Sequence, residues 1–473
     1  MTRCLFWNVE HFGEKRFYNA SSDTDTDAGM TWALSSTARK DLLYRVIEAA
    51  NPDIIVIVET VAQSTKGSRM AQRITAPVEL LNWLRTTAPT VRSAGWRLVP
   101  PLVLAGQPGN VGQEAIAVFY RGTTGTTERY FTGPNIWPGG VDGPSLLPGT
   151  RPAAAYGTNK RLGQNVDLNA FLVPPTTTAR TIPAGALHNG NGTTAENTVG
   201  ARIQLRVLTS GAAGANLDFG VARPPFMVSF TEQASGGALR NLTLFGVHAP
   251  ANAPGAARYI TDLSTAFEVS GALGTHETRI IGGDFNANLL QDDGTLTTTF
   301  DPLTKDNSYR QLLRPTAGAP STPGALEAWK GYFGTHINPL DDPPLVSNRQ
   351  TSRFLWSNGS TASYYPPYRY QSAAYYSIDN VLIWPLDGSR DYQTTIMNTV
   401  VSSPLSAVTP VPAGASAGSV AVAAEIEPII PFVWPQAPDA ADYDAGNATM
   451  LLAWERYGHI VSTSDHFALF TDV

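Results

Sequence analysis

The sequence predicts an α/β fold in which buried strands alternate with helices and long loops. Two apolar runs, residues 3–9 and 54–58, have the length and composition of buried strands, and a segment with helical spacing, residues 36–51, separates them. A strand, a helix and a second strand at this spacing are typical of layered α/β folds. The 42 glycines and 35 prolines indicate many turns and long connecting loops.

The first two predicted strands also carry the first polar residues that are candidates for a functional site. The strand at residues 3–9 is apolar up to Asn8. The helix at residues 36–51 places Leu43, Val46 and Ile47 on one face, and the proline after Asn51 ends it. The second strand is followed directly by Glu59, so both strands are predicted to end in a polar side chain.

Further strands are predicted along the whole chain, and 223–230 is expected to pair antiparallel with 242–248. The predicted strands are residues 113–121, 223–230, 242–248, 279–282, 377–384 and 467–471, and a second helix is predicted at residues 257–270. Stretches rich in Gly, Pro, Thr and Ala lie between them, near residues 122–160, 174–200 and 403–446. We interpret residues 1–473 as a single domain with long loop insertions.

Charge and cysteine content exclude several classes of protein. A net charge of −6 argues against a protein that coats nucleic acid through a basic surface, although an enzyme needs only a local cationic site. The single cysteine, Cys4, excludes an intramolecular disulfide. The start of the chain lacks a signal-peptide apolar region, and no apolar run has the length of a membrane span. We therefore expect a soluble cytoplasmic protein without stable membrane association, with export by a signal-less route left open.

Polar side chains of a restricted kind stand at the ends of the predicted strands. They are Asn8, Glu59, Glu114, His248, Asp284, Asn286, Asp379, Asp465 and His466. Strand ends of a layered α/β fold often meet at one edge, where acids and histidines can hold a hard cation and grip a phosphate. For any one residue, capping of a strand is the simpler interpretation. The ordered set favours an active site.

Short motifs around these residues resemble those of a known family. The motifs are residues 6–13, 52–60, 113–121, 223–226, 247–250, 283–287 (GDFNA), 378–382 and 464–466 (SDH). In this order they resemble the endonuclease/exonuclease/phosphatase family, specifically its branch with pancreatic-type deoxyribonuclease. The resemblance implies a four-layer sandwich of two mixed β-sheets packed face to face, with helices outside.

The resemblance also implies a metal-dependent hydrolysis. Glu59 would bind Mg²⁺ or Mn²⁺, assisted by Asn8 and Asp465, because hard cations prefer oxygen ligands. Asp284 would orient or deprotonate the attacking water, and Asn286 would donate to a phosphate oxygen.

Two histidines would complete the chemistry. By resemblance, His248 and His466 would bind the phosphate or act as general acid and base, since imidazole titrates near neutral pH. Glu114 would hold His248, and Asp379 would hold His466, each in its working tautomer. The remaining histidines and one acidic turn are interpreted as bystanders: His11, His188, His276, His336, His459 and Asp292-Asp293.

Two arginines are the predicted contacts to substrate phosphates. Arg223 belongs to a motif strand, and Arg369 lies in a tyrosine-rich segment, residues 364–376, whose rings can stack on bases. A rigid loop packed on the sheet explains this segment equally well, and an aromatic cage for choline is a weaker third interpretation. Two positions depart from the deoxyribonuclease pattern. Glu10 stands where some relatives have a DNA-contacting Arg, and Val61 has no nearby Arg.

The sequence thus predicts a divalent-metal-dependent phosphodiesterase, an endonuclease that hydrolyses DNA with little sequence specificity. A sphingomyelinase-type phospholipid phosphodiesterase would share the same core but needs an exposed apolar hairpin, for which the sequence gives no clear signal. An inositol-phosphate phosphatase would carry a Trp-Cys-Asp-Arg-like motif where this chain has Ser377-Ile378-Asp379-Asn380. A non-catalytic binding module would lack some catalytic groups, whereas this chain has the full set.

Overall fold

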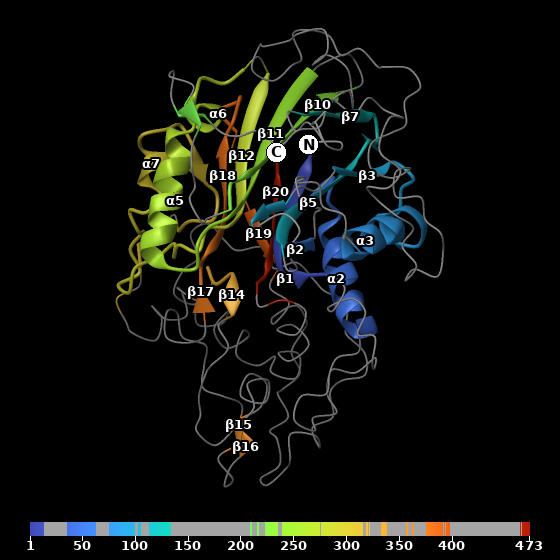
Figure 1. Ribbon diagram of the computed structural model, residues 1–473, viewed down its shortest axis with the longest axis horizontal. Coiled ribbons are helices and arrows are strands. Elements are labelled where there is room, and N and C mark those ends of the chain that lie inside the picture. Colours follow the sequence, from blue (N-terminus) through green and yellow to red (C-terminus); the bar gives the residue numbers. More distant parts are fainter. Residues whose placement is uncertain are drawn as a thin grey trace.

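The protein forms two β-sheets between two groups of helices (Figure 1). The computed structural model describes residues 1–13, 36–62, 75–99, 103–105, 113–133, 209–210, 215–216, 223–234, 239–274, 276–315, 318–319, 321, 333–337, 356–357, 362–363, 375–390, 392, 394–397, 464 and 466–473. None of the described helices is long and apolar enough to cross a membrane.

The first sheet joins strands from the two ends of the chain. Its strands follow the order β19-β20-β1-β2-β5-β3, with β4 also paired to β5. β1 is parallel to β2, and the other pairs are antiparallel. The bounds are β1 (Arg3–Phe12), β2 (Ile54–Ala62), β3 (Trp96–Val99), β4 (Val103–Ala105), β5 (Gln113–Arg121), β19 (Thr394–Met397) and β20 (Ala468–Asp472).

The second sheet is also mixed. Its order is β13-β18-β12-β11-β10-β7-β6, and β11 and β12 are its parallel pair. The bounds are β6 (Thr123–Thr124), β7 (Thr127–Gly133), β10 (Phe226–Gln233), β11 (Leu239–His248), β12 (Glu277–Asp284), β13 (Arg310–Gln311) and β18 (Asp379–Trp384). The antiparallel pairing expected between residues 223–230 and 242–248 is confirmed as that of β10 with β11.

Three short two-stranded ladders complete the described strands. They are β14 (His336–Ile337) with β17 (Tyr375–Tyr376), β15 (Trp356–Ser357) with β16 (Ala362–Ser363), and β8 (Thr209–Ser210) with β9 (Ala215–Asn216).

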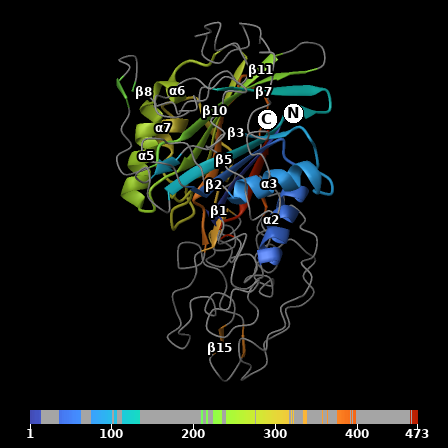
Figure 2. The ribbon, with the colours of Figure 1, turned by 45° about the vertical axis from the view of Figure 1, so that its right-hand side comes forward.

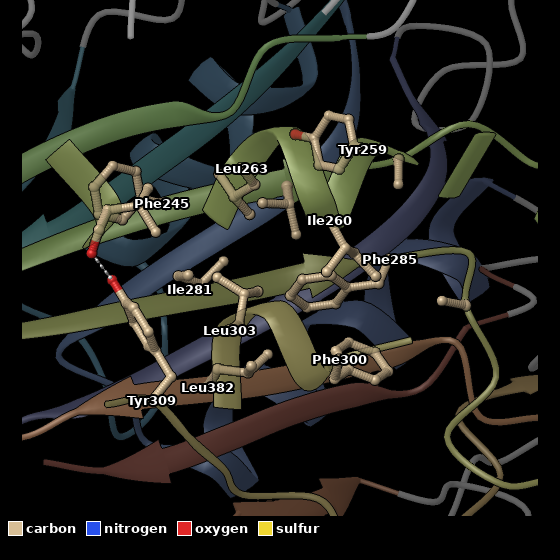
Figure 3. Packing of buried hydrophobic residues seen from close by; sticks show 14 of the residues in the cluster. Phe245, Tyr259, Ile260, Leu263, Ile281, Phe285, Phe300, Leu303, Tyr309 and Leu382 are labelled. Carbon is tan, nitrogen blue, oxygen red and sulfur yellow. Dashed lines mark hydrogen bonds between the residues drawn. The ribbon is translucent and has the colours of Figure 1, made fainter. Parts of the chain in front are cut away.

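Helices cover the outer faces of both sheets, so the predicted four-layer sandwich is confirmed. Figure 2 shows α2 and α3 beside the first sheet and α5 and α7 beyond the second. On α5, Tyr259, Ile260 and Leu263 pack with Phe245 of β11 and Ile281 of β12 in one buried apolar cluster (Figure 3). The helices are α2 (Ser36–Ala50), α3 (Thr75–Thr86), α5 (Ala253–Thr265), α6 (Phe267–Ser270) and α7 (Asp301–Thr304).

Glycine allows the two sheets to approach closely at their centres. A methyl group at Gly282 of β12 would lie 2.6 Å from the ring of Phe6 on β1. A methyl group at Gly246 of β11 would lie 3.1 Å from Ile116 on β5. The first contact is shorter than packed carbon atoms tolerate, so Gly282 is required for the observed spacing of the sheets, whereas the second is tight and would force the Ile116 side chain to shift slightly.

Several boundaries differ from the sequence-based prediction, and two of the differences have a clear local cause. The loop expected from residue 122 begins later, because residues 123–133 form the hairpin β6-β7, with Gly125 at φ 57° in its turn. The helix expected at residue 257 begins at Ala253, since the Asn252 side chain accepts from Gly255 N at 2.8 Å and Pro254 occupies the first turn. The helix α3 and the strand β19 were not predicted.

A buried ionic network ties the sheets together at the start of β1. The Glu232 carboxylate on β10 accepts from Arg129 Nε at 2.5 Å and from Thr2 Oγ1 at 2.6 Å. Arg240 on β11 donates to its other oxygen, with Nε at 2.9 Å. Burial raises the pKa of Glu232, but the charges of Arg129 and Arg240 and the Thr2 hydrogen bond outweigh this and leave the pKa lowered. Glu232 is therefore a buried charge that its partners satisfy.

Replacing Glu232 by glutamine should lower the free energy of unfolding by about 3 kcal/mol, because Arg129 would lose its buried counter-charge. Urea unfolding followed by circular dichroism measures the change. Asp262→Asn is the matched control: it breaks the exposed pair with Arg258 on α5 and should change the free energy by less than about 0.5 kcal/mol. Equal effects of the two substitutions would contradict a structural role for the network.

Candidate active site

The alternation of side chains along the strands gathers polar groups at one edge of the sandwich. Residues two apart on a strand face the same side. On four strands, a polar residue lies two positions from a residue at which the two sheets come close together, either a large side chain or the glycine opposite it. The pairs are Phe6 and Asn8, Ile116 and Glu114, Gly246 and His248, and Gly282 and Asp284.

Glu59 reaches the same place through a β-bulge. Val56 of β2 faces the opposite sheet, where a methyl group on Gly246 would meet it at 3.3 Å. Strict alternation would point Glu59 to the other side. The pairing of β2 with β5 shifts register between Ile57 and Thr60, and Glu59 has φ 58°. Bulges re-aim side chains in this way, and the strand continues to Ala62 instead of ending before Glu59 as predicted.

Asn8 connects the carboxylates of the two sheets. Its Nδ2 donates to Glu59 Oε1 at 3.2 Å and to Asp284 Oδ2 at 3.1 Å, and its Oδ1 accepts from Glu10 N at 3.1 Å. The Asn8 side chain is fully buried. Ser464 Oγ donates to the Asn8 carbonyl at 2.6 Å, which fixes the backbone at the same point. Asn8 thus holds two acidic groups in place without adding charge.

Two histidine–carboxylate pairs face the Asp284 carboxylate. His248 Nδ1 lies 2.5 Å from Glu114 Oε1, and its Nε2 lies 3.6 Å from Asp284 Oδ2. His466 Nδ1 lies 2.8 Å from Asp379 Oδ2, and its Nε2 lies 3.8 Å from the same Asp284 oxygen. These are the pairs that the family resemblance implies. Each carboxylate orients an imidazole so that the other ring nitrogen faces the centre.

Burial and neighbouring charge shift the pKa values at this centre. Burial raises the pKa of Asp284, and the favourable charges of His466 and His248 do not fully offset this increase. Burial lowers the pKa of His248, but the hydrogen bond to Glu114 and the nearby carboxylates outweigh it, so that the pKa is raised. The site therefore contains a carboxylate that accepts a proton more readily than usual and an imidazole suited to holding one.

The donor groups suit a divalent cation. Among the described residues, two groups have ligand atoms within 4.8 Å of one another: Glu59 with His248 and Asp284, and Asp284 with Asp379 and His466. In the second group Asp379 already bonds the His466 ring. The first offers two carboxylates beside the Asn8 amide, and oxygen-rich sets of this kind fit Mg²⁺ or Mn²⁺.

Asn286 lies at the edge of the centre. Its backbone N–H donates to Asp284 Oδ1 at 2.8 Å, and its Nδ2 donates to Ala249 O at 2.8 Å. Asn286 itself has φ 47°, which turns the chain immediately after β12. Three residues earlier, Gly283 has φ 133°, and a methyl group there would lie only 2.4 Å from Val247 O. The GDFN sequence is thus required both by backbone conformation and by the position of its polar groups.

Of the two arginines predicted to contact substrate phosphates, only Arg223 is among the described residues. Arg223 Nε donates to Glu114, the carboxylate that also holds His248, so Arg223 lies beside the centre and supports this pair. Its contact with a substrate phosphate stays a prediction. Arg369 and the predicted metal-assisting Asp465 lie outside the described residues.

Two histidines interpreted as bystanders lie next to the site. His11 Nδ1 is 3.9 Å from Glu59 Oε2, and the ring of His336 lies 4.5 Å from that of His466 at an angle of 63°. His11 follows Asn8 closely in the sequence, and this proximity could have indicated its place beside the site. No sequence pattern indicated His336, because an isolated β-bridge between His336 and His466 joins segments far apart in the chain.

A mixed-sheet sandwich with this set of acids, amides and imidazoles defines a class of phosphoester hydrolases. The endonuclease/exonuclease/phosphatase family model matches residues 5–372, and the chain belongs to this family. No curated protein matches the chain in sequence.

Solved structures with a similar fold are distant in sequence. The human Nocturnin catalytic domain has 12% identity, with 81% of this chain and 82% of that chain covered and a TM-score of 0.31. A family protein from Leptotrichia buccalis has 9% identity, coverage of 100% and 99%, and a TM-score of 0.37. Truncated Caenorhabditis elegans TDP2 has 9% identity, coverage of 99% and 96%, and a TM-score of 0.33.

Glu59→Gln should abolish high-affinity binding of Mn²⁺ while the fold survives, because the substitution keeps the shape and removes the charge of a hard ligand. Titration calorimetry with Mn²⁺, with circular dichroism as the test of folding, measures both properties. Glu48→Gln, on helix α2 away from the centre, is the matched control and should bind like the original protein. Unchanged Mn²⁺ affinity in Glu59→Gln would overturn the metal assignment.

Proposed function

We propose that the protein is a divalent-metal-dependent phosphodiesterase that cuts DNA internally with little sequence specificity. The observation that carries this proposal is the pair of imidazoles, His248 and His466, whose Nε2 atoms lie 3.6 and 3.8 Å from one Asp284 oxygen. We further take residues 1–473 as one catalytic domain, since β1 and β20 from the two ends of the chain pair in one sheet.

The chain's own groups supply proton transfer and orientation. Asp284, which faces the Nε2 atoms of both imidazoles, orients a water molecule and accepts its proton. One imidazole donates to a phosphate oxygen while the other protonates the leaving oxygen, each kept in position by its carboxylate partner. Asn286 donates to a phosphate oxygen from the rim. A Mg²⁺ or Mn²⁺ ion held by Glu59, with Asn8 and Asp465 assisting, would stabilise the negative charge that develops on the phosphate.

The preference for DNA rests on the resemblance to the deoxyribonuclease branch and on the arginines. Arg223, beside Glu114, and Arg369 are the proposed contacts to backbone phosphates. Contacts of this kind do not read bases, so cleavage is insensitive to sequence. With a net charge of −6 the protein gains little from general attraction to nucleic acid, and few phosphates are engaged.

Supercoiled plasmid should be nicked in the presence of Mg²⁺, giving open-circle and then linear DNA. A closed circle has no ends, so this result separates an endonuclease from an exonuclease. Agarose electrophoresis with Mg²⁺, with Mn²⁺ and with excess chelator measures it, and Glu59→Gln serves as the inactive control. If plasmid stays intact with every metal while sphingomyelin or an inositol phosphate is hydrolysed, the DNA assignment is wrong and a lipid or phosphatase activity replaces it.

His248→Ala and His466→Ala should each lower the cleavage rate by at least about a hundredfold, the usual scale of lost acid–base catalysis. Glu114→Ala and Asp379→Asn should cost less, because they only orient an imidazole. Initial rates of plasmid nicking at saturating Mg²⁺ measure all four. The proposed pairing is contradicted if Glu114→Ala is clearly slower than His248→Ala.

A further inference from the structure

Asn286 is one of the residues that line a cavity next to the centre. The volume of this cavity is about 550 Å³, within the range of about 300–1,000 Å³ that small-molecule pockets occupy. The segment after β12 provides most of the wall, and the first residue of α5 closes it. The described lining residues are Ala253, Asn286, Ala287, Asn288, Leu290, Gln291, Asp292, Asp293, Thr297 and Thr299.

The chemistry of this lining is uncharged or acidic. Amides and hydroxyls that can donate and accept hydrogen bonds stand beside a small apolar surface from Ala253. No Lys, Arg or His is among the described residues that line the cavity, and Asp292 and Asp293 add exposed carboxylates. Such a lining suits a sugar or a base and repels an additional phosphate.

The cavity and the candidate active site share the residue Asn286. Asn286 belongs both to the cavity wall and to the centre, since its backbone N–H donates to Asp284. A phosphate held at the centre therefore has one of its ester substituents at the mouth of the cavity. The wall is well supported: Thr297 Oγ1 donates to Asn288 O at 2.9 Å, and Asp293 Oδ1 accepts from Thr295 N at 2.9 Å.

We infer that this cavity binds the nucleoside attached to the cleaved phosphate and excludes the next phosphate along the strand. The inference rests on the proposed phosphodiesterase function and deepens it, because it defines which part of the substrate lies on this side. The amides and hydroxyls contact the sugar and base, the exposed Ala253 offers a small apolar contact, and Asp292 and Asp293 keep a second phosphate out.

The test uses small chromogenic diesters with Mg²⁺. The probes are the p-nitrophenyl esters of thymidine 5′-phosphate and thymidine 3′-phosphate, the same esters with a phosphate on the free hydroxyl, and bis(p-nitrophenyl) phosphate. The enzyme should prefer one thymidine ester over bis(p-nitrophenyl) phosphate in kcat/KM. The added phosphate should lower kcat/KM by about fivefold, which is the scale of an exposed charge interaction. This decrease should be smaller at high salt, because salt screens exposed charges.

Two sets of variants assign the effect to the cavity. Asp292→Asn combined with Asp293→Asn should remove most of the penalty for the added phosphate. Thr299→Val should lower the ratio of thymidine ester to bis(p-nitrophenyl) phosphate hydrolysis, a readout that general destabilisation would not move. Asp387→Asn, in an exposed turn outside the cavity, also removes a surface carboxylate and should alter neither ratio.

The possible failures are distinguishable. If none of the diesters is hydrolysed with any divalent metal, the proposed function itself fails. If the diesters are hydrolysed but both ratios stay unchanged in the cavity variants, the nucleoside assignment is overturned while the phosphodiesterase stands. A changed Mg²⁺ requirement in the Asp292 and Asp293 variants, without a changed ratio, would make the acidic turn a cation site and also overturn the assignment.

Discussion

The side-chain amide of Asn8 is the constraint on which the site depends. It donates to Glu59 from its own sheet and to Asp284 from the facing sheet, at 3.2 and 3.1 Å. Two carboxylates this close to one amide would repel each other in a buried setting. The amide, together with the nearby imidazoles and a cation, compensates for this repulsion. The centre is therefore stable only where both sheets end at the same edge.

The packing of the sheets makes that coincidence possible. Each sheet has one parallel pair at its centre, β1 with β2 and β11 with β12, and these pairs run toward the site. Gly282 lets β12 approach Phe6, so that Asp284, two residues on, lies within reach of Asn8. At the other end of β1, Thr2 joins the Glu232 network. The sandwich is thus held at both ends of the same strand, and groups carried on such strands keep their positions better than groups on loops.

Much of this arrangement follows from sequence periodicity, and the exceptions have physical causes. His248 and Asp284 end apolar strands and Asn8 follows an apolar run within β1, so their convergence could be predicted. The orientation of Glu59 could not, because it depends on a bulge that strand alternation does not reveal. The contact of His336 with His466 depends on a bridge between distant segments, and local patterns carry no information about it. The hairpin β6-β7 was missed because its threonines and glycine read as loop.

The distribution of charge bears on how an acidic protein would act on the polyanion that we propose as its substrate. Its arginines near the centre serve carboxylates first: Arg223 supports Glu114, and through it His248. Attraction for phosphate would then come from a bound cation and from the His248 imidazole, whose protonation the Glu114 hydrogen bond and the surrounding carboxylates favour. Attraction of this kind is confined to a few ångströms around one phosphate. On the proposed function, a strand that meets amides, hydroxyls and acids beyond that point would be positioned by the fit of the sugar and base next to the centre and by the proposed contacts of Arg223 and Arg369 with flanking phosphates.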